Sequence, residues 1–351
     1  MKTSQQQASR LVDDLRRTHR RGECPIQVIS APHEFNATDL YVDLASVVGE
    51  RLILKCEGFN FAGSIKLKAA HAMVSAAERA GDLRPGSTIV ESSSGNLGVA
   101  LSIVACNRGY RFICVTDSRC TLASRQLMQL LGSEVHVVTE PHPVDGLLGA
   151  RIQRVRELCA GVSDSVWLNQ YANPNNWMAH HQLTGPEILK AFPDLGVLFV
   201  GSGTTGTLMG CARYMREHKP SVRIVAIDAA GSVTFGGPSQ TRMIPGLGTG
   251  VRPQLLDESY VDDVVIVPEI DTIRSCRQLA RRGFLFGGST GTVVSGATAW
   301  LAEHPLAADV SAVAIAPDLG ERYLDTVYQD QWVSDLYGPG ALQEAVAAES
   351  H

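Results

Sequence analysis

Short apolar runs alternate along this chain with longer segments in which apolar residues recur every three or four positions. The short runs predict β-strands, whereas the longer segments, such as 96–109 and 123–132, have helical spacing. The predicted strands are 51–55, 87–91, 111–115, 134–138, 165–169, 197–201, 222–228, 263–267 and 313–317. Because strands that alternate with helices form parallel sheets covered on both faces, the pattern predicts an α/β protein.

The number of predicted strands is high for a single sheet, and a chain of 351 residues is long enough for two domains. We therefore expect two packed parallel-sheet α/β domains with a binding cleft between them. The smaller N-terminal domain is predicted to cover residues 45–160, and the larger domain residues 1–44 together with 161–351.

Charge and composition narrow the possible partners. The formal net charge is −5, and the one basic run, residues 15–21, is short enough to be a solvated helix end or a mobile terminus. The N-terminal segment lacks the apolar core of a signal peptide, and no apolar run reaches the ~18–20 residues of a membrane-spanning helix. The eight cysteines contain no CxxC pair, which predicts mostly buried thiols in a reducing compartment. We expect a cytoplasmic protein with no metal site and no nucleic-acid or membrane partner.

Four predicted strand-to-helix loops are rich in Gly, Ser, Thr and Asn, at the sheet edge where parallel α/β proteins bind ligands. The first loop, residues 60–66 (NFAGSIK), has two interpretations. Ser64 can cap the following helix. Alternatively, Lys66 lies near the helix N-terminus and partly out of water, and both conditions favour a neutral, nucleophilic amine.

The second loop, residues 91–98 (ESSSGNLG), offers several hydrogen-bond donors in one place. Ser94 can simply cap the helix that follows. Together with Ser93, Asn96 and the free backbone N–H groups of a helix start, it can instead bind a carboxylate. The Asn96 amide can also donate a hydrogen bond to a phenolate-type oxygen.

The third loop, residues 200–210 (VGSGTTGTLMG), has the composition and position of a phosphate site. It lacks both the lysine of a Walker loop and the glycine spacing of a dinucleotide site, so a single phosphate is predicted. The fourth loop, residues 286–292, contains Ser289, which is either a helix cap or the partner of an unprotonated ring nitrogen. The predicted phosphate ligands are Gly203, Thr204, Thr205, Gly206 and Thr207.

The combination of the four loops indicates a specific chemistry. A lysine amine, a monophosphate site and a carboxylate-binding turn are what an amino-acid enzyme that uses pyridoxal 5'-phosphate requires. In such enzymes the lysine holds the cofactor aldehyde as a Schiff base, while a Gly/Thr-rich loop holds the phosphate. We therefore predict pyridoxal 5'-phosphate as the cofactor.

From about residue 40 to about residue 320 the chain resembles the fold-type II pyridoxal-phosphate enzymes of the cysteine synthase and cystathionine β-synthase family. The family's lysine motif, N-P-x-x-S-x-K, matches NFAGSIK, which implies that Lys66 forms the Schiff base. The turn SSGNL matches the family's T-S-G-N-T, which implies that Asn96 contacts the ring oxygen of the cofactor. By the same resemblance, the ligands of the substrate carboxylate are Ser93, Ser94, Asn96 and Gln170.

The resemblance extends to the other two loops. GSGTTGT matches the family's phosphate loop, with Thr205 where a glycine is commoner, and Ser289 matches the serine that faces the pyridine nitrogen. Residues 244–250 (IPGLGTG) match the loop that borders the substrate entrance. The family's habit also implies a homodimer, and the end of the chain soon after this region predicts no appended regulatory domain.

Three residues near these motifs depart from the family pattern. Lys68 stands where the family has arginine and is interpreted as structural or solvent-facing. Leu97 replaces a threonine in the carboxylate turn, which removes one hydroxyl donor, and Phe61 replaces a proline in the lysine motif. These departures indicate a specificity different from that of ordinary cysteine synthases.

The resemblance implies β-replacement on a serine derivative that carries a leaving group. The freed Lys66 amine is expected to remove the Cα proton, after which the β-substituent leaves and a nucleophile adds at Cβ. A neutral pyridine nitrogen facing Ser289 makes the ring a milder electron sink, which favours loss of the β-substituent over transamination.

Residues 231–248 resemble the enzymes that make N-(2-amino-2-carboxyethyl)-L-glutamate from O-phospho-L-serine and L-glutamate, for the 2,3-diaminopropionate of siderophores and peptide antibiotics. We predict this substrate pair, with Arg242 either contacting a substrate phosphate or carboxylate or lying on the surface. The nearest alternative is a cysteine synthase that combines O-acetylserine or O-phosphoserine with sulfide. A dehydratase or racemase of the same fold, a nicotinamide-dependent oxidoreductase and a non-catalytic binding protein have less support.

Overall fold

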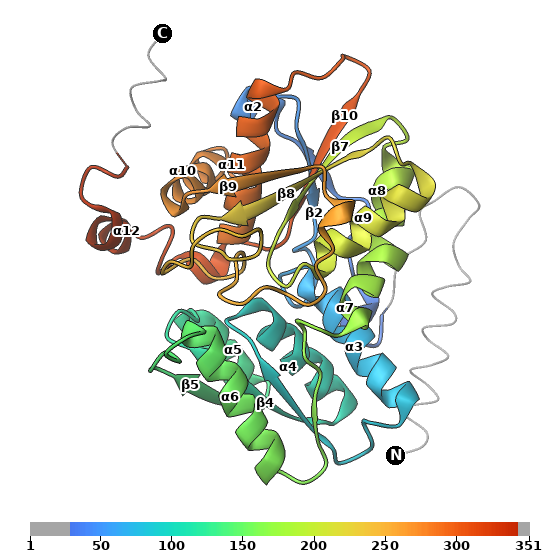
Figure 1. Cartoon of the computed structure of the whole chain (residues 1–351), viewed down its shortest axis with the longest axis vertical. Helices are drawn as coiled ribbons and strands as arrows, with labels where there is room; N and C mark the ends of the chain where they lie inside the picture. The colour runs from blue at the N-terminus through green and yellow to red at the C-terminus, as the bar shows by residue number, and fades with distance from the viewer. Residues whose placement is uncertain (1–28, 343–351) are drawn as a thin grey trace.

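The computed structural model describes residues 29–342 and contains two sheets, one above the other in the view of Figure 1. Helices cover both faces of each sheet, as the alternating pattern predicts. The basic run 15–21 and part of the predicted segment 1–44 lie outside the described residues. No helix in the described part of the chain is both long and apolar enough to cross a membrane.

The larger sheet has six strands in the order β1-β2-β10-β7-β8-β9. Neighbouring strands are parallel except for β1, which pairs antiparallel with β2. The sequence pattern did not indicate β1, because three residues are too few to show an alternating pattern. The strands are β1 Tyr41–Asp43, β2 Ile53–Cys56, β7 Leu195–Gly201, β8 Arg223–Ala229, β9 Asp263–Val267 and β10 Ser311–Ala316.

The smaller sheet has four strands in the order β5-β4-β3-β6, and all of its neighbouring strands are parallel. In both sheets the predicted loops therefore leave the carboxyl edge. Its strands are β3 Thr88–Ser92, β4 Arg111–Asp117, β5 Glu134–Val138 and β6 Ser165–Trp167.

Most helices connect successive strands, and two of them end at a glycine. The glycines at 81 and 109 follow α3 and α4 with φ of 79° and 75°, the left-handed conformation that favours glycine at a helix C-terminus. The helices are α2 Ala45–Val48, α3 Lys66–Ala80, α4 Asn96–Arg108, α5 Leu122–Leu130, α6 Gly146–Gly161, α7 Pro174–Ala179, α8 Gly185–Ala191, α9 Gly206–His218, α10 Glu269–Arg281, α11 Gly288–Glu303 and α12 Asp330–Tyr337. Short turns of 3-10 helix are η1 Pro32–Glu34, η3 Glu258–Tyr260 and η4 Glu321–Tyr323, and η2 His180–Thr184 is a π-helical turn between α7 and α8.

Separate apolar cores lie on the two faces of each sheet. On one face of the larger sheet α11 packs on the strands, where the rings of Phe199 and Trp300 meet edge to face with 5.5 Å between their centroids. The opposite face is covered by α8 and α9. Of the seven described cysteines, all free thiols, five are buried among apolar side chains, as predicted.

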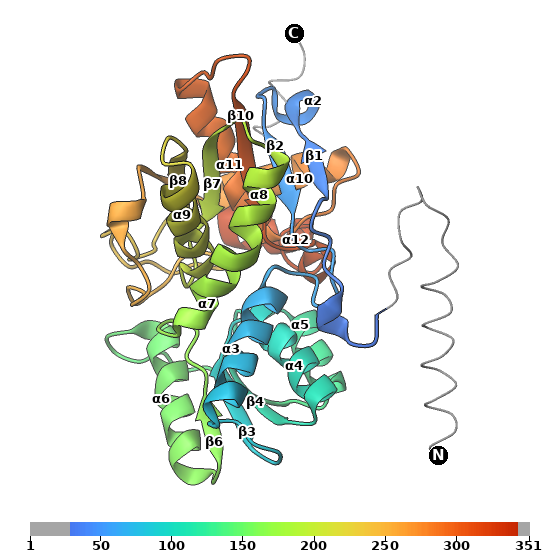
Figure 2. The same cartoon turned by 90° about the vertical axis from the view of Figure 1, so that its right-hand side faces the viewer.

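The chain passes between the two sheets twice. It leaves the larger sheet after β2, enters α3 and reaches the smaller sheet at β3, and it returns from β6 through α7 and α8 to β7. Helices α3 and α7 pack against each other at this junction (Figure 2). The sheets thus divide the chain at different residues from the predicted ranges, since β2 belongs to the larger sheet and β6 to the smaller one. The division into two domains stays a prediction.

Candidate active site

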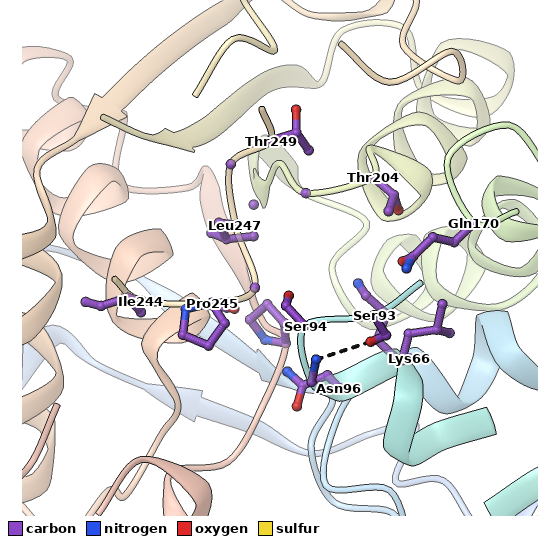
Figure 3. A pocket seen from close by; sticks show the side chains of 18 of the residues that line it. Lys66, Ser93, Ser94, Asn96, Gln170, Thr204, Ile244, Pro245, Leu247 and Thr249 are labelled. Atoms are coloured by element: carbon purple, nitrogen blue, oxygen red, sulfur yellow. Dashed lines mark hydrogen bonds between the residues drawn. The ribbon is translucent and has the colours of Figure 1, made fainter. Parts of the chain in front are cut away.

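One pocket lies where the carboxyl edges of the two sheets face each other, and all four predicted loops line it. Figure 3 shows Lys66, Ser93, Ser94 and Asn96 on one side, with Gln170 and Thr204 opposite the 244–250 loop. The pocket therefore brings together side chains from segments far apart in the sequence. The predicted site residues that line it are Lys66, Ser93, Ser94, Asn96, Gln170, Gly203, Thr204, Thr205, Gly206, Thr207, Arg242 and Ser289.

Lys66 is the first residue of α3, and the loop before it is fixed by the side chain of Asn60. The Asn60 amide donates to the carbonyl oxygens of Glu57 and Ser64 at 3.1 and 3.0 Å, and its oxygen accepts the N–H of Ala62 at 2.9 Å. Ser64 is not the helix cap, because Ile65 occupies that position and no side chain caps the helix. The hydrogen bonds of Asn60 therefore hold the loop in the fold that places Lys66 in the pocket.

The Lys66 side chain is half-buried and lines the pocket. Burial lowers its pKa, and the nearby carboxylate of Asp318 acts in the opposite direction by raising it. Because a lowered pKa increases the fraction of neutral amine at a given pH, Lys66 has the property that a nucleophile or a general base requires.

Ser93 organises the turn before α4. Its hydroxyl oxygen accepts the backbone N–H groups of Gly95 and Gly98 at 3.2 and 2.9 Å, and the first of these bonds lies within the group drawn in Figure 3. The Ser93 hydroxyl hydrogen is therefore available to donate to a bound carboxylate. Ser94, the other candidate cap, makes no side-chain cap bond to α4.

Asn96 is held from two sides. Its Nδ2 donates to Oδ2 of Asp318 at 2.9 Å, and its Oδ1 accepts from Nη1 of Arg322 at 2.9 Å. Arg322 also donates to the carbonyl oxygen of Ala62, so it joins the lysine loop to the carboxylate turn. These two bonds fix the orientation of the Asn96 amide, with Nδ2 toward Asp318 and Oδ1 toward Arg322.

Asp318, Arg322 and Tyr323 belong to no motif that could be recognised in the sequence. Asp318 is 1% exposed, accepts from the Tyr323 hydroxyl at 2.6 Å, and has its pKa raised by burial. Gly287 leaves room for it, since a Cβ there would lie 2.4 Å from the Asp318 carboxyl carbon. The feature of the sequence that could have pointed to Asp318 is its position directly after a strand, β10, at the same sheet edge as the other loops.

The predicted phosphate loop connects β7 to the N-terminus of α9, where backbone N–H groups are free to bind an anion. Thr205 has φ of 65°, a strained conformation for a β-branched residue and one of the kind found at functional sites. A Cβ at Gly203 would lie 2.7 Å from the carbonyl oxygen of Gly246, so this glycine allows a close backbone approach. The loop has the shape of an anion cradle.

Gln170 and Thr204 share one partner. Nδ2 of Asn176 donates to the carbonyl oxygen of Gln170 at 2.8 Å and to the Thr204 hydroxyl at 3.0 Å. Nε2 of Gln170 donates to the carbonyl oxygen of Ser92 at 2.6 Å. The predicted carboxylate and phosphate ligands are thus tied into one network.

Ser289 lies in the first turn of α11, under the 244–250 loop. Gly246 has φ of 115°, and a Cβ there would lie 2.2 Å from the Ser289 hydroxyl oxygen. Glycine is therefore required at 246 for the entrance loop to pass over Ser289.

Arginines give the pocket a positive end. Arg242 is 6% exposed, which excludes the surface interpretation, and both burial and the charge of Arg119 lower its pKa. Arg151 is 3% exposed, and its Nη1 has no hydrogen-bond partner among the described residues. Asp117 is an anionic partner of both Arg119 and Arg151, at 2.8 and 3.1 Å. Arg119 and Arg151 were not predicted from the sequence, because they belong to no recognised motif.

The three departures from the family pattern lie in different environments. Lys68 does not face solvent: it is buried, and its Nζ lies 2.9 Å from Glu57 and 2.8 Å from Glu187. Leu97 is buried in the core of the smaller sheet and lines the pocket. Phe61 is 59% exposed.

Comparison with known proteins agrees with this geometry. Residues 38–318 match the family described as "Pyridoxal-phosphate dependent enzyme". The chain belongs to this family. Membership in this pyridoxal-phosphate family rules out the nicotinamide-dependent alternative and makes the protein an enzyme with pyridoxal 5'-phosphate as its cofactor.

Two relatives in this pyridoxal-phosphate family are named N-(2-amino-2-carboxyethyl)-L-glutamate synthase. The one from Ralstonia nicotianae is 40% identical over 286 residues, which cover 80% of this chain and 83% of the relative. The one from Cupriavidus metallidurans is 38% identical over 296 residues, which cover 84% of this chain and 87% of the relative.

Solved structures show the same fold. O-ureido-L-serine synthase superposes with a TM-score of 0.78 at 31% identity, covering 92% of this chain and all of that one (100%). The O-acetylserine-dependent cystathionine beta-synthase from Helicobacter pylori has a TM-score of 0.77 at 25% identity, and the match covers 87% of this chain and 100% of that one. The predicted fold-type II architecture is therefore confirmed.

The residues of the pocket fit this cofactor. The half-buried Lys66, with its lowered pKa, can hold the aldehyde, and the 203–207 loop, whose glycines leave no room for side chains, can hold the phosphate. Ser289 can face the ring nitrogen, and Asn96, with its fixed amide, can face the ring oxygen.

Proposed function

We propose that this enzyme performs β-replacement on O-phospho-L-serine with the amine of L-glutamate, which gives N-(2-amino-2-carboxyethyl)-L-glutamate for 2,3-diaminopropionate biosynthesis. The observation that carries the proposal is a group of three arginines, the buried Arg151 and Arg242 and the half-buried Arg119, in the pocket that contains Lys66. The names of the two relatives support it further.

The arginines fit this substrate pair better than the alternative. O-phospho-L-serine brings a phosphate leaving group, and glutamate brings two carboxylates, whereas O-acetylserine and sulfide bring neither. Nη1 of Arg151 has no hydrogen-bond partner among the described residues, and the charge of Arg119 lowers the pKa of Arg242, so a bound anion would give Nη1 an acceptor and offset the repulsion between Arg119 and Arg242.

When bound, the cofactor would supply an electron sink for Cα of the substrate and so make the Cα proton acidic. We assign the transfer of this proton to the Lys66 Nζ, whose lowered pKa supplies a neutral amine. Ser93, Ser94 and Gln170 bind the substrate carboxylate and hold Cα within reach of Lys66. Because the Ser289 hydroxyl is neutral, it would not stabilise a protonated ring nitrogen, and an unprotonated ring would favour departure of the phosphate.

We propose a homodimer in the cytoplasm, and exposed apolar side chains support a subunit interface. Phe35 and Phe61, whose ring centroids are 6.0 Å apart, are 36% and 59% exposed. Light scattering of the purified protein tests the assembly, and a monomeric mass would contradict it.

The deciding experiment follows the visible absorption of the purified enzyme. The lysine-bound cofactor is expected to give a band that Lys66→Ala lacks, that changes with O-phospho-L-serine, and that returns with L-glutamate. Mass spectrometry is then expected to find N-(2-amino-2-carboxyethyl)-L-glutamate. A band that returns only with sulfide, with cysteine as the product, would establish the cysteine synthase alternative.

A further inference from the structure

We propose that Lys68, Thr184 and His180 form a directed hydrogen-bond relay that turns the hydroxyl hydrogen of Thr207 toward the cofactor phosphate. These four residues are called the relay. The inference rests on the proposed phosphate role of residues 203–207. It gives Lys68, which departs from the family pattern, a positioning role at a site that it does not touch.

The direction of the relay begins at the Lys68 ammonium group, which has three hydrogens and can only donate. Its Nζ donates to Glu57 at 2.9 Å, to Glu187 at 2.8 Å and to the Thr184 hydroxyl at 3.2 Å. Three acceptors use the three hydrogens. The Thr184 oxygen is therefore an acceptor toward Lys68.

Thr184 must place its own hydroxyl hydrogen elsewhere. The residue is 0% exposed, and Nδ1 of His180, at 3.1 Å, is the one other hydrogen-bond partner of this hydroxyl among the described residues. Since a buried hydroxyl without an acceptor is costly, Thr184 donates to Nδ1. His180 is then the tautomer that carries its hydrogen on Nε2.

The His180 ring remains neutral. It is 0% exposed, and burial, reinforced by the charges of Lys68 and Lys66, lowers its pKa well below the ordinary histidine value. A neutral ring has one donor and one acceptor nitrogen, so fixing Nδ1 as the acceptor fixes Nε2 as the donor.

The relay ends at the phosphate loop. Nε2 of His180 lies 3.3 Å from the Thr207 hydroxyl oxygen, which accepts the ring hydrogen. Thr207 is in the first turn of α9 and lines the pocket, so its own hydrogen is free to donate to an anion there. In the opposite tautomer, Nε2 of His180 would have no hydrogen and would accept the hydroxyl hydrogen of Thr207. The Thr207 oxygen would then have no hydrogen left to donate to the phosphate.

The backbone is built to hold this geometry. His180 and Thr184 begin and end the π-helical turn η2, a rare structure that is frequent at functional sites. Gly210 of α9 lets η2 approach closely, since a Cβ there would lie 2.3 Å from the Trp177 carbonyl oxygen and 2.6 Å from Cβ of His180. The relay therefore has a fixed path from α3 through η2 to α9.

The test uses Lys66→Ala protein, which cannot attach the cofactor covalently, and measures dissociation constants for pyridoxal phosphate and for pyridoxal, which lacks the phosphate. Adding Thr184→Val is expected to weaken the binding of pyridoxal phosphate about 10- to 100-fold, the range for a hydrogen bond to a charged group. The affinity for pyridoxal is expected to stay unchanged. Thr184→Ser, which keeps the hydroxyl, is expected to retain the affinity.

Thr298→Val is the matched control, because the buried Thr298 hydroxyl has no hydrogen-bond partner among the described residues. It is expected to change neither constant. If Thr184→Val leaves the affinity for pyridoxal phosphate unchanged, or weakens both ligands equally, the relay is wrong. If the Lys66→Ala parent itself does not prefer pyridoxal phosphate to pyridoxal, the phosphate site is wrong, and with it the proposed function.

A second measurement needs no cofactor. Nitrogen NMR of the cofactor-free protein, with His180 assigned by comparison with His180→Asn, is expected to show hydrogen on Nε2 alone. Thr184→Val is expected to give a mixture of the two tautomers. Hydrogen on Nδ1 in the unaltered protein would overturn the proposal.

Discussion

Nδ2 of Asn96 donates a 2.9 Å hydrogen bond to the carboxylate of Asp318, which stands 222 residues later in the chain. The two residues follow strands of different sheets, β3 and β10. The carboxylate thus serves two residues of the pocket, since it also raises the pKa of Lys66 against the effect of burial.

Asp318→Asn removes the negative charge and is expected to lower the pKa of Lys66 further, since the carboxylate is the group that raises it. In the cofactor-free enzyme, the midpoint for acylation of Lys66, followed by mass spectrometry across pH, is expected to move to lower pH. Asp325→Asn, at an exposed position nearby in the chain, is expected to leave it in place. A midpoint that moves upward would contradict the assignment.

Arg242→Met is expected to lower kcat/KM for O-phospho-L-serine by about 10-fold or more, because the charges of Arg242 and Arg119 together suit a dianionic phosphate. Turnover of O-acetylserine is expected to change little. Steady-state kinetics with both donors measure the ratio, and Arg154→Met, a partly exposed arginine on α6, is the control. An equal loss with both donors would instead place Arg242 at the nucleophile.

Gly246→Ala is expected to reduce both stability and cofactor affinity, because the new Cβ would lie 2.2 Å from the Ser289 hydroxyl oxygen. Gly236→Ala is the matched control: its φ is also positive, at 83°, but a Cβ there meets nothing within 4 Å. The control is expected to lose only about 1 kcal/mol of unfolding free energy from backbone strain. Urea denaturation and cofactor titration measure the two effects, and equal losses in the two variants would refute the close contact.

Glu91 is fully buried, and burial raises its pKa from 4.5 to about 7. Because the folded protein then holds this proton more tightly than the unfolded chain, Glu91 stabilises the fold below about pH 4.5 and loses that contribution as pH rises through about 7. The loss between these values is about 3 kcal/mol. Urea unfolding is expected to show that the free energy of unfolding falls less between pH 5 and pH 8 in Glu91→Gln than in the unaltered protein. An equal fall in the two proteins would contradict this.

The strands and the four loops could be predicted because each has a local signal: apolar runs for strands, and Gly, Ser and Thr before a helix for ligand loops. Lys68 could not be placed in the same way. Its partners Glu57 and Glu187 stand 11 and 119 residues away in the chain, so their convergence depends on the packed fold. The same holds for Asp318, whose importance comes from contacts with Asn96, Tyr323 and Lys66 rather than from a motif.

The two passages of the chain between the sheets have a mechanical consequence. Lys66, the first residue of α3, lies on the first passage, and Gln170, shortly before α7, lies on the second; α3 and α7 pack against each other. If the sheets rotate to admit a substrate, this packed pair is the hinge, and points at a hinge move least. Lys66 and Gln170 would keep their separation while Ser93 and Ser94 swing with the smaller sheet. The proposed reactive amine and one proposed carboxylate ligand would then stay in place, and the turn before α4 would be the part that closes on the amino acid.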